Sequence, residues 1–216
     1  MYSLSLRNLS LKQEYRSDRD NLVSEFFVPC LSSCIQFDRA IQYVTAKSIH
    51  DLWAGFKDLA NNNARLRIIT GHRFRPEELS ILSKSFHEEN KEKTPANHTI
   101  VDANNIEILR KIIHNNNLEI KIAIPDTEVC ITFSENIGIF KDSEDNIVAF
   151  SGTANETFSN QNRNFESIDV FTSWNDKSRV ETKIKDFENL WKNETRHVKV
   201  YDLSYAEKNN LLKYSV

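Results

Sequence analysis

The most informative stretch of this sequence is VAFSGTANET at residues 148–157, followed by NFESIDVF at residues 164–171. Each block contains a short run of β-branched and aromatic residues, and a polar segment with a glycine and several asparagines lies between the runs. Such runs, bounded by Gly, Asn and Ser, are typical of strands. The two blocks therefore predict strands at residues 147–151 and 167–173.

Working outward, the same signals recur along the chain and alternate with segments of helical periodicity. We expect strands at residues 39–45, 65–70, 119–124, 129–133, 136–140 and 197–203, with residues 141–146 as a hairpin link. We expect helices at residues 21–28, 46–61, 76–89, 104–114 and 180–193. This order, β-α-β-α-β, a hairpin and β-α-β, predicts an α/β fold in which helices flank both faces of a mixed sheet.

Composition limits the classes of protein to consider. The chain has 216 residues and a formal net charge of -3, so it is long enough for a full core and has no overall basic signature. Three cysteines without paired spacing favour a reducing compartment, and Cys30 and Cys34 are interpreted as buried thiols rather than metal ligands. The sequence has no apolar run of about 20 residues and no secretory signal. We therefore expect a cytoplasmic protein with no membrane partner.

At this point the chain resembles a known family. FSENIGIF at residues 133–140, VAFSGTANET and NFESIDVF are similar to the motif of the phospholipase D-like nuclease superfamily. The resemblance is to the type found at the N-terminus of prokaryotic superfamily 2 helicases and in related restriction nucleases. It extends over residues 38–203. It implies a phospholipase D-like domain at residues 38–216, with residues 1–37 as an extension packed on it in one globular unit.

The resemblance also implies a chemistry. In this superfamily a histidine attacks phosphorus, a second motif supplies the acid, and no metal or other cofactor is required. One motif per chain implies a homodimer with a shared site. Gly152 and Thr153 match the glycine-serine turn, Asn155 matches the asparagine, and Glu166 matches the downstream glutamate that orients a histidine. Asp142 lies about one residue from the motif's aspartate.

The chain departs from the family at the nucleophile. Ser134 stands where the histidine belongs, and Asn136 stands where the lysine belongs. A serine without a neighbouring base is a poor nucleophile, and asparagine lacks the charge that balances developing phosphate charge. We expect both residues to line one pocket, because residues two apart share a strand face. The degenerate catalytic set is thus Ser134, Asn136, Asn155 and Glu166.

Other polar residues have competing interpretations. His72, with Arg73, follows a strand at the end where α/β sheets place ligands, so both join Gly152 and Thr153 as candidate phosphate-binding residues, although a solvated loop is the simpler interpretation of His72. Lys141, Asp142 and Asp145 are interpreted as an exposed hairpin turn. Six aromatic residues are interpreted as core packing: Trp53, Phe56, Phe171, Trp174, Phe187 and Trp191. Four basic residues are interpreted as a solvated helix face: Lys177, Arg179, Lys183 and Lys185.

Three functions follow as alternatives. The first is a catalytically impaired nuclease-family domain that binds DNA or another phosphodiester as a dimer in a restriction or antiviral defence system. Such a domain would work with a helicase in the same or another chain, because this sequence has no GKT or GKS phosphate loop. The second is a non-catalytic module for dimerisation or partner recruitment. The third is an active metal-independent endonuclease with a non-standard nucleophile.

Overall fold

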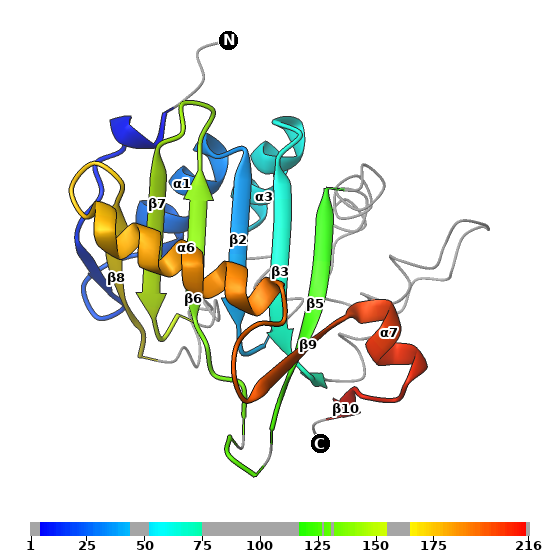
Figure 1. Ribbon diagram of the computed structural model, residues 1–216. Helices are drawn as coiled ribbons and strands as arrows, with labels where there is room; N and C mark the ends of the chain where they lie inside the picture. The colour runs from blue at the N-terminus through cyan, green and yellow to red at the C-terminus, as the bar shows by residue number, and fades with distance from the viewer. Residues whose placement is uncertain are drawn as a thin grey trace.

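An eight-stranded sheet forms the centre of the molecule in the computed structural model (Figure 1). The structure describes residues 5–43, 52–74, 117–126, 128–130, 132–154 and 165–214. The strand order is β1-β8-β7-β6-β2-β3-β5-β9. The strands are β1 (Glu14–Arg16), β2 (Gln36–Ile41), β3 (Arg65–Gly71), β5 (Leu118–Pro125), β6 (Ile137–Lys141), β7 (Ile147–Gly152), β8 (Ser167–Thr172) and β9 (Val198–Asp202).

The sheet is mixed, as the sequence predicts. β2, β3 and β5 are parallel neighbours, whereas β6, β7, β8 and β1 continue the sheet in antiparallel order, and β9 is antiparallel to β5. The predicted hairpin joins β6 to β7, with Ile137 opposite Ser151. A small second sheet pairs β4 (Arg73–Phe74) with β10 (Lys213–Tyr214) in parallel.

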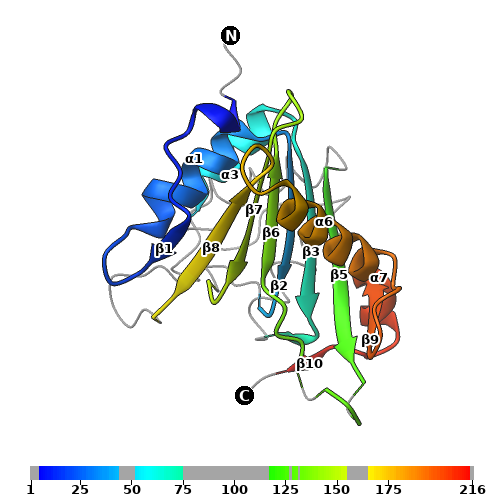
Figure 2. The same ribbon diagram turned by 60° about the vertical axis from the view of Figure 1, so that its left-hand side comes forward.

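Helix α6 (Lys177–Trp191) crosses one face of the sheet, as Figures 1 and 2 show. Its apolar side chains Val180, Phe187 and Leu190 are buried in a cluster with sheet residues such as Ala40 and Ile69. Phe171 is buried in the same cluster, which confirms that Phe171 and Phe187 are core residues. The basic residues Lys177, Arg179 and Lys185 are exposed, as expected for a solvated helix face.

A second, larger cluster contains the N-terminal segment and the helices α1 (Val28–Ser33) and α3 (Trp53–Asn61). Its sheet residues alternate with those that α6 covers. Phe37, Leu66 and Phe140 belong to this cluster, whereas Ala40, Ile69 and Ile139 belong to the other. Because successive side chains of a strand point to opposite faces, the two clusters lie on opposite sides of the sheet. The 3₁₀ turn Leu6–Asn8 and strand β1 bring residues 5–16 into this packing.

Several predicted boundaries differ from the structure. The helix expected to end near Pro29 continues to Ser33, because a π-helical segment (Val23–Phe27) leads directly into α1, in which Pro29 is the second residue. The strand expected at residues 129–133 is wrong. Val129 and Cys130 donate backbone hydrogen bonds to the Asp126 carbonyl in a turn, and Val129 is exposed.

The strand expected at residues 39–45 begins three residues earlier, at Gln36, and ends at Ile41. Strand β1 and helix α7 (Leu203–Lys208) were not expected from the sequence. The helices expected at residues 76–89 and 104–114 lie outside the described residues. Within the described part of the chain, no helix has both the length and the apolar character needed to cross a bilayer.

Candidate functional site

Ser134, Asn136, Glu166 and His72 lie at one edge of the sheet, which we call the carboxyl edge. It consists of the residues that follow β1, β2, β3, β5 and β7 and those that precede β6, β8 and β9. Because β2, β3, β5 and β7 run in one direction and β6 and β8 in the other, these ends coincide, at the bottom of Figure 1. Ligands of α/β sheets bind outside the carboxyl ends of the strands, so a binding site is expected at this edge.

Ser134 lies on the carboxyl edge in the segment that precedes β6, and its side chain is exposed. Its hydroxyl lies 3.2 Å from that of Thr132, and either group could be the donor. No basic side chain among the described residues forms a hydrogen bond with Ser134. The expectation that Ser134 and Asn136 share a strand face does not hold, because β6 begins only at Ile137 and Asn136 is buried.

Asn136 is 8% exposed, and its amide group is committed to the backbone. Its Nδ2 donates to the carbonyl oxygen of Ala154 at 2.8 Å. Its Oδ1 is buried and has no hydrogen-bond partner among the residues that the structure describes. One hydrogen of the Asn136 amide is therefore bound to the backbone, and the buried atom without a described partner is an acceptor.

Arg39 is a member of this site that the sequence analysis missed. It is 2% exposed, and its guanidinium donates to the carbonyl oxygens of Ala154 at 2.7 Å, Ile137 at 3.0 Å and Ala40 at 2.8 Å. The guanidinium also lies over the Phe150 ring, 5.0 Å from its centroid. Arg39 and Asn136 therefore hold the same carbonyl group, one residue before the motif asparagine, Asn155.

At the glycine-threonine turn, the backbone of Gly152 and Thr153 lies close to the backbone of Ser167. A Cβ on Gly152 would lie 2.2 Å from the carbonyl oxygen of Ser167, so only glycine fits there. The Thr153 hydroxyl accepts from the Ser167 N–H at 3.0 Å and lies 3.4 Å from the Ser167 carbonyl. Thr153 thus extends the pairing of β7 with β8, and its hydroxyl is occupied by the backbone.

Glu166 is buried beside the start of β8, at 3% exposure. Its backbone N–H donates to the Ser17 hydroxyl at 3.0 Å, and its carbonyl accepts from the Ser17 N–H at 2.9 Å. These bonds join the end of β1 to the start of β8. The motif asparagine Asn155 lies outside the described residues.

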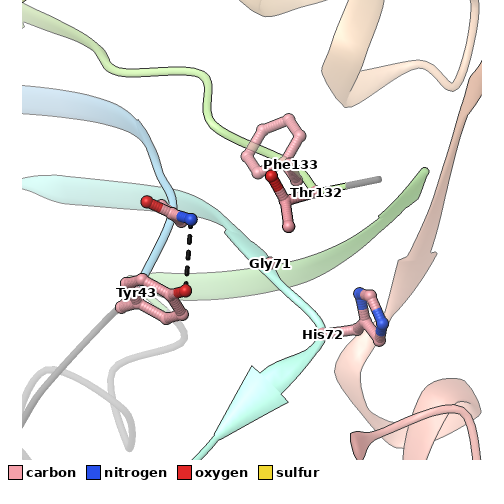
Figure 3. A pocket seen from close by; sticks show the side chains of 6 residues that line it. Tyr43, Gly71, His72, Thr132 and Phe133 are labelled. Carbon is pink, nitrogen blue, oxygen red and sulfur yellow. Dashed lines mark hydrogen bonds between the residues drawn. The ribbon is translucent and has the colours of Figure 1, made fainter. Parts of the chain in front are cut away.

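His72 lines a small pocket between the ends of β2 and β3, as Figure 3 shows. The pocket is shallow, with a cavity volume of about 10 Å³, room for about one water molecule, and its lining consists of Gln42, Tyr43, Gly71, His72, Thr132 and Phe133. His72 is 4% exposed, so the interpretation as a solvated loop residue is wrong. The backbone of Arg73 belongs to β4, whereas its side chain lies outside the described part of the chain.

Asp142 contradicts the expectation of an exposed turn. It is 1% exposed and binds the N-terminal segment through the Ser5 hydroxyl and the Leu6 N–H, both at 2.9 Å. Burial opposes ionisation of this carboxyl group, but hydrogen bonds from Asn146, Leu6 and Ser5 outweigh it and lower the pKa of Asp142 below its usual 3.8. Its neighbours Lys141 and Asp145 form an exposed ion pair at 2.7 Å, as an ordinary hairpin turn would.

The cysteines and acidic groups do not form a metal centre in the described residues, where no cluster of three or more potential ligands occurs. Cys30 and Cys34 are both fully buried. Burial raises the pKa of Cys34 to about 12 and that of Cys30 well above its usual range. Both thiols therefore stay protonated, as expected for packing residues.

Comparisons with known proteins give similarities to solved structures alone. No protein-family model matches the chain, and no curated protein matches it. Among solved structures, it is similar to the crystal structure of phosphatidylserine synthase from Haemophilus influenzae Rd KW20, with 12% sequence identity and a TM-score of 0.49. The alignment covers 92% of this chain and 41% of that one, so this chain spans about two-fifths of its length.

Proposed function

We propose that the chain is a phospholipase D-like domain that binds DNA or another phosphodiester at its carboxyl edge without cleaving it. The nucleophile position carries this proposal. Ser134 has the Thr132 hydroxyl as its hydrogen-bond neighbour, and a hydroxyl is no base for it. A serine attacks phosphorus only when a base takes its proton, so the arrangement around Ser134 supports binding without turnover.

Among the described residues, the donors nearest to Ser134 in the motif also bind the backbone. The amide of Asn136 and the hydroxyl of Thr153 hydrogen-bond backbone groups, and Arg39 donates to three carbonyl oxygens. Catalysis of phosphoryl transfer needs donors aimed at the oxygens on which charge develops. Because these donors bind the protein's own backbone, they support a structural role for Asn136 and Thr153 of the motif.

The wider setting is also part of this proposal. By the family resemblance, the sheet flanked by helices on both faces is a phospholipase D-like scaffold, and the chain pairs with a second copy. A helicase in the same or another chain would act beside it in a restriction or phage-defence system. The family's endonuclease activity would be impaired in this member.

A non-catalytic recruitment module is the second candidate, and the acidic connection from β5 to β6 favours it, whereas the exposed cations Arg19 and Arg196 at the same edge favour a phosphodiester. Asp126, Glu128 and Glu135 are exposed in the connection from β5 to β6, and Arg39 is buried. A phosphodiester backbone is bound mainly by exposed cations. This acidic connection is a better match for a protein partner than for a phosphate chain.

One experiment separates the candidates. Purified protein is incubated in EDTA with single-stranded and double-stranded DNA, and both cleavage and gel shift are measured. We expect a shift without cleavage. If neither a shift nor cleavage is observed, the recruitment module is the remaining candidate. Cleavage in EDTA would mean that the protein is an active enzyme that uses another nucleophile.

A further inference from the structure

We infer that a groove beside the edge strand β1 binds an extended, uncharged peptide segment of a partner protein, which adds to the sheet as a further strand. We call it the β1 groove, and it is lined by Leu9, Ser10, Leu11, Lys12, Tyr15, Glu25 and Pro29. It shares no residue with the carboxyl edge, so the inference goes beyond phosphodiester binding and does not depend on it.

The β1 groove has the size of a ligand site. Its cavity volume is about 320 Å³, within the roughly 300–1,000 Å³ of pockets that hold a ligand. One wall is the chain before β1, with Leu9 and Leu11, and the other is helical, with Glu25 and Pro29; the two lie side by side in Figure 2. Glu25 belongs to the π-helical segment, and such widened turns occur frequently at functional sites.

Tyr15 lies between the two walls and connects them. Its side chain is buried, and its hydroxyl oxygen accepts from the Lys12 N–H at 3.1 Å and lies 3.5 Å from the Glu25 carbonyl oxygen. The Lys12 ammonium adds a second connection, because it binds the Glu25 carboxylate at 2.6 Å and that of Asp20 at 2.7 Å. These contacts hold the walls together, so the groove is a defined part of the fold.

The backbone of β1 offers unused hydrogen-bonding groups next to the groove. The Gln13 carbonyl oxygen accepts from the Val170 N–H, so this pair is bonded. The Ser17 N–H donates to the Glu166 carbonyl oxygen, so the pair four residues along is bonded too. Bonded pairs alternate in antiparallel strands, so the N–H and C=O of Glu14 point away from β8. Within the described ranges these two backbone groups have no hydrogen-bond partner.

The rest of this sheet edge is closed by the protein itself. The Arg16 N–H donates to the Asp20 carboxylate at 2.8 Å, and the Arg16 carbonyl oxygen accepts from the Asp20 N–H at 2.8 Å. At the other edge of the sheet, the outward N–H of Val200 donates to the Asn193 side chain at 2.8 Å. Proteins cover edge strands in this way to avoid unwanted pairing. In β1 the position that stays open is Glu14, beside the groove.

An open edge position beside an apolar groove matches the way in which sheets bind extended peptides. Main-chain hydrogen bonds to the edge strand supply affinity, and pockets that accept alternate side chains supply specificity. A strand that pairs with Glu14 points every second side chain to the side of the sheet that carries Tyr15. The β1 groove lies on that side, and its leucine and proline walls suit apolar side chains.

The charges around the groove favour an uncharged peptide. Residues 12–25 contain three basic side chains and four carboxylates, and all of them form ion pairs with one another. Binding a phosphate chain or a strongly charged peptide would compete with these pairs. A neutral peptide leaves them intact, so its affinity should change little with salt.

The test is an NMR titration of the isotope-labelled full chain with an acetylated and amidated hexapeptide of alternating threonine and leucine. We expect saturable shifts of the Ser10 and Glu14 amide signals. Two further peptides are N-methylated, one at the threonines and one at the leucines, which keeps every side chain. Pairing with one strand edge uses only one of these two sets of N–H groups, so one form should bind at least about tenfold more weakly than the other.

Glu14→Pro is the decisive variant, because it removes the open N–H without removing a bond of the sheet. It should weaken binding at least about tenfold, whereas the matched control Glu14→Ala keeps the N–H and should bind like the wild type. Ser10→Trp fills the groove from an exposed position and should also weaken binding, and thermal unfolding checks that each variant is folded.

The inference is overturned if millimolar peptide does not shift the Ser10 and Glu14 signals. It is also overturned if both N-methylated forms bind like the parent peptide, or if folded Glu14→Pro and Ser10→Trp variants bind like the wild type. None of these results would bear on phosphodiester binding at the carboxyl edge.

Discussion

Asp142 shows at the scale of one residue what a buried carboxylate does in this fold. It receives five hydrogen bonds, from Ser5, Leu6, Glu144 and twice from Asn146. Asp142→Asn would place an NH₂ group against donors, so we expect the free energy of unfolding to fall by about 2–4 kcal/mol in urea titrations. Asp145→Asn, at a side chain 83% exposed, is the control and should change stability by less than about 0.5 kcal/mol.

The same carboxylate should make stability depend on pH. The pKa of Asp142 is lowered in the folded protein, so the unfolded chain binds its proton more readily. The stabilisation is present above the unfolded pKa of about 3.9 and is lost as pH falls through the lower folded pKa. Between pH 5 and 2 the wild type should therefore lose stability more steeply than Asp142→Asn, and parallel curves for the two proteins would refute this.

Two of the residues whose burial could not be predicted from the sequence, Asp142 and Arg39, are charged. Asp142 was expected in solvent because nothing in the local sequence shows that Ser5 and Leu6 return to it from the far end of the chain. Arg39 was overlooked because arginine is seldom fully buried unless it is paired. Ser134 and Glu166, in contrast, lie just before β6 and β8, as the predicted strands at residues 136–140 and 167–173 indicated.

At the scale of elements, β6 and β7 pack through a contact that only glycine permits. A Cβ on Gly138 would lie 2.0 Å from the Phe150 ring. We expect Gly138→Ala to lower the free energy of unfolding by about 1–3 kcal/mol, the usual cost of overpacking a core. In a Phe150→Leu background the same substitution should cost less, and additive effects in this double-mutant cycle would show that the ring is not the cause.

Helix α6 is fixed to the sheet by a buried charge network. Arg67 donates to both carboxylate oxygens of Asp38, at 2.7 and 2.6 Å, and to Glu188 of α6 at 2.7 Å. Arg67→Ala would leave Asp38 buried without its partner and should cost about 3–5 kcal/mol in denaturant unfolding. Arg65→Ala removes an exposed pair with Glu119 and should cost at most about 1 kcal/mol, so equal effects would contradict a special role for Arg67.

The predictability of each strand follows from its content of β-branched residues. Strands β3, β5 and β7 are rich in Ile, Val and Thr and were predicted to within one residue at each end. The start of β2 was misplaced because the charged Asp38 was taken as lying before the strand, although it is buried within it. The expected strand at residues 129–133 has the right composition, but Asp126 organises a turn there, and composition does not reveal a turn.

At the scale of the whole molecule, the order of the strands determines which motif residues lie close together. The alternation of helices and strands predicted a mixed α/β sheet, and the structure confirms it. Strand order was not predictable from sequence. It is the antiparallel return of β6 and β8 beside the parallel β2 and β3 that brings Asn136, Glu166 and His72 to one edge. Local patterns carry no information on such long-range pairing.

The most direct measurement is a cleavage assay in EDTA on the Ser134→His/Asn136→Lys double variant beside the wild type and Ser134→Ala/Asn136→Ala. If these positions belong to a phospholipase D-like site that has lost its nucleophile, the double reversion should cut DNA about 100-fold or more above both other proteins. Cleavage by the wild type, or a folded, DNA-binding reversion with no cleavage, would contradict the assignment of Ser134 and Asn136.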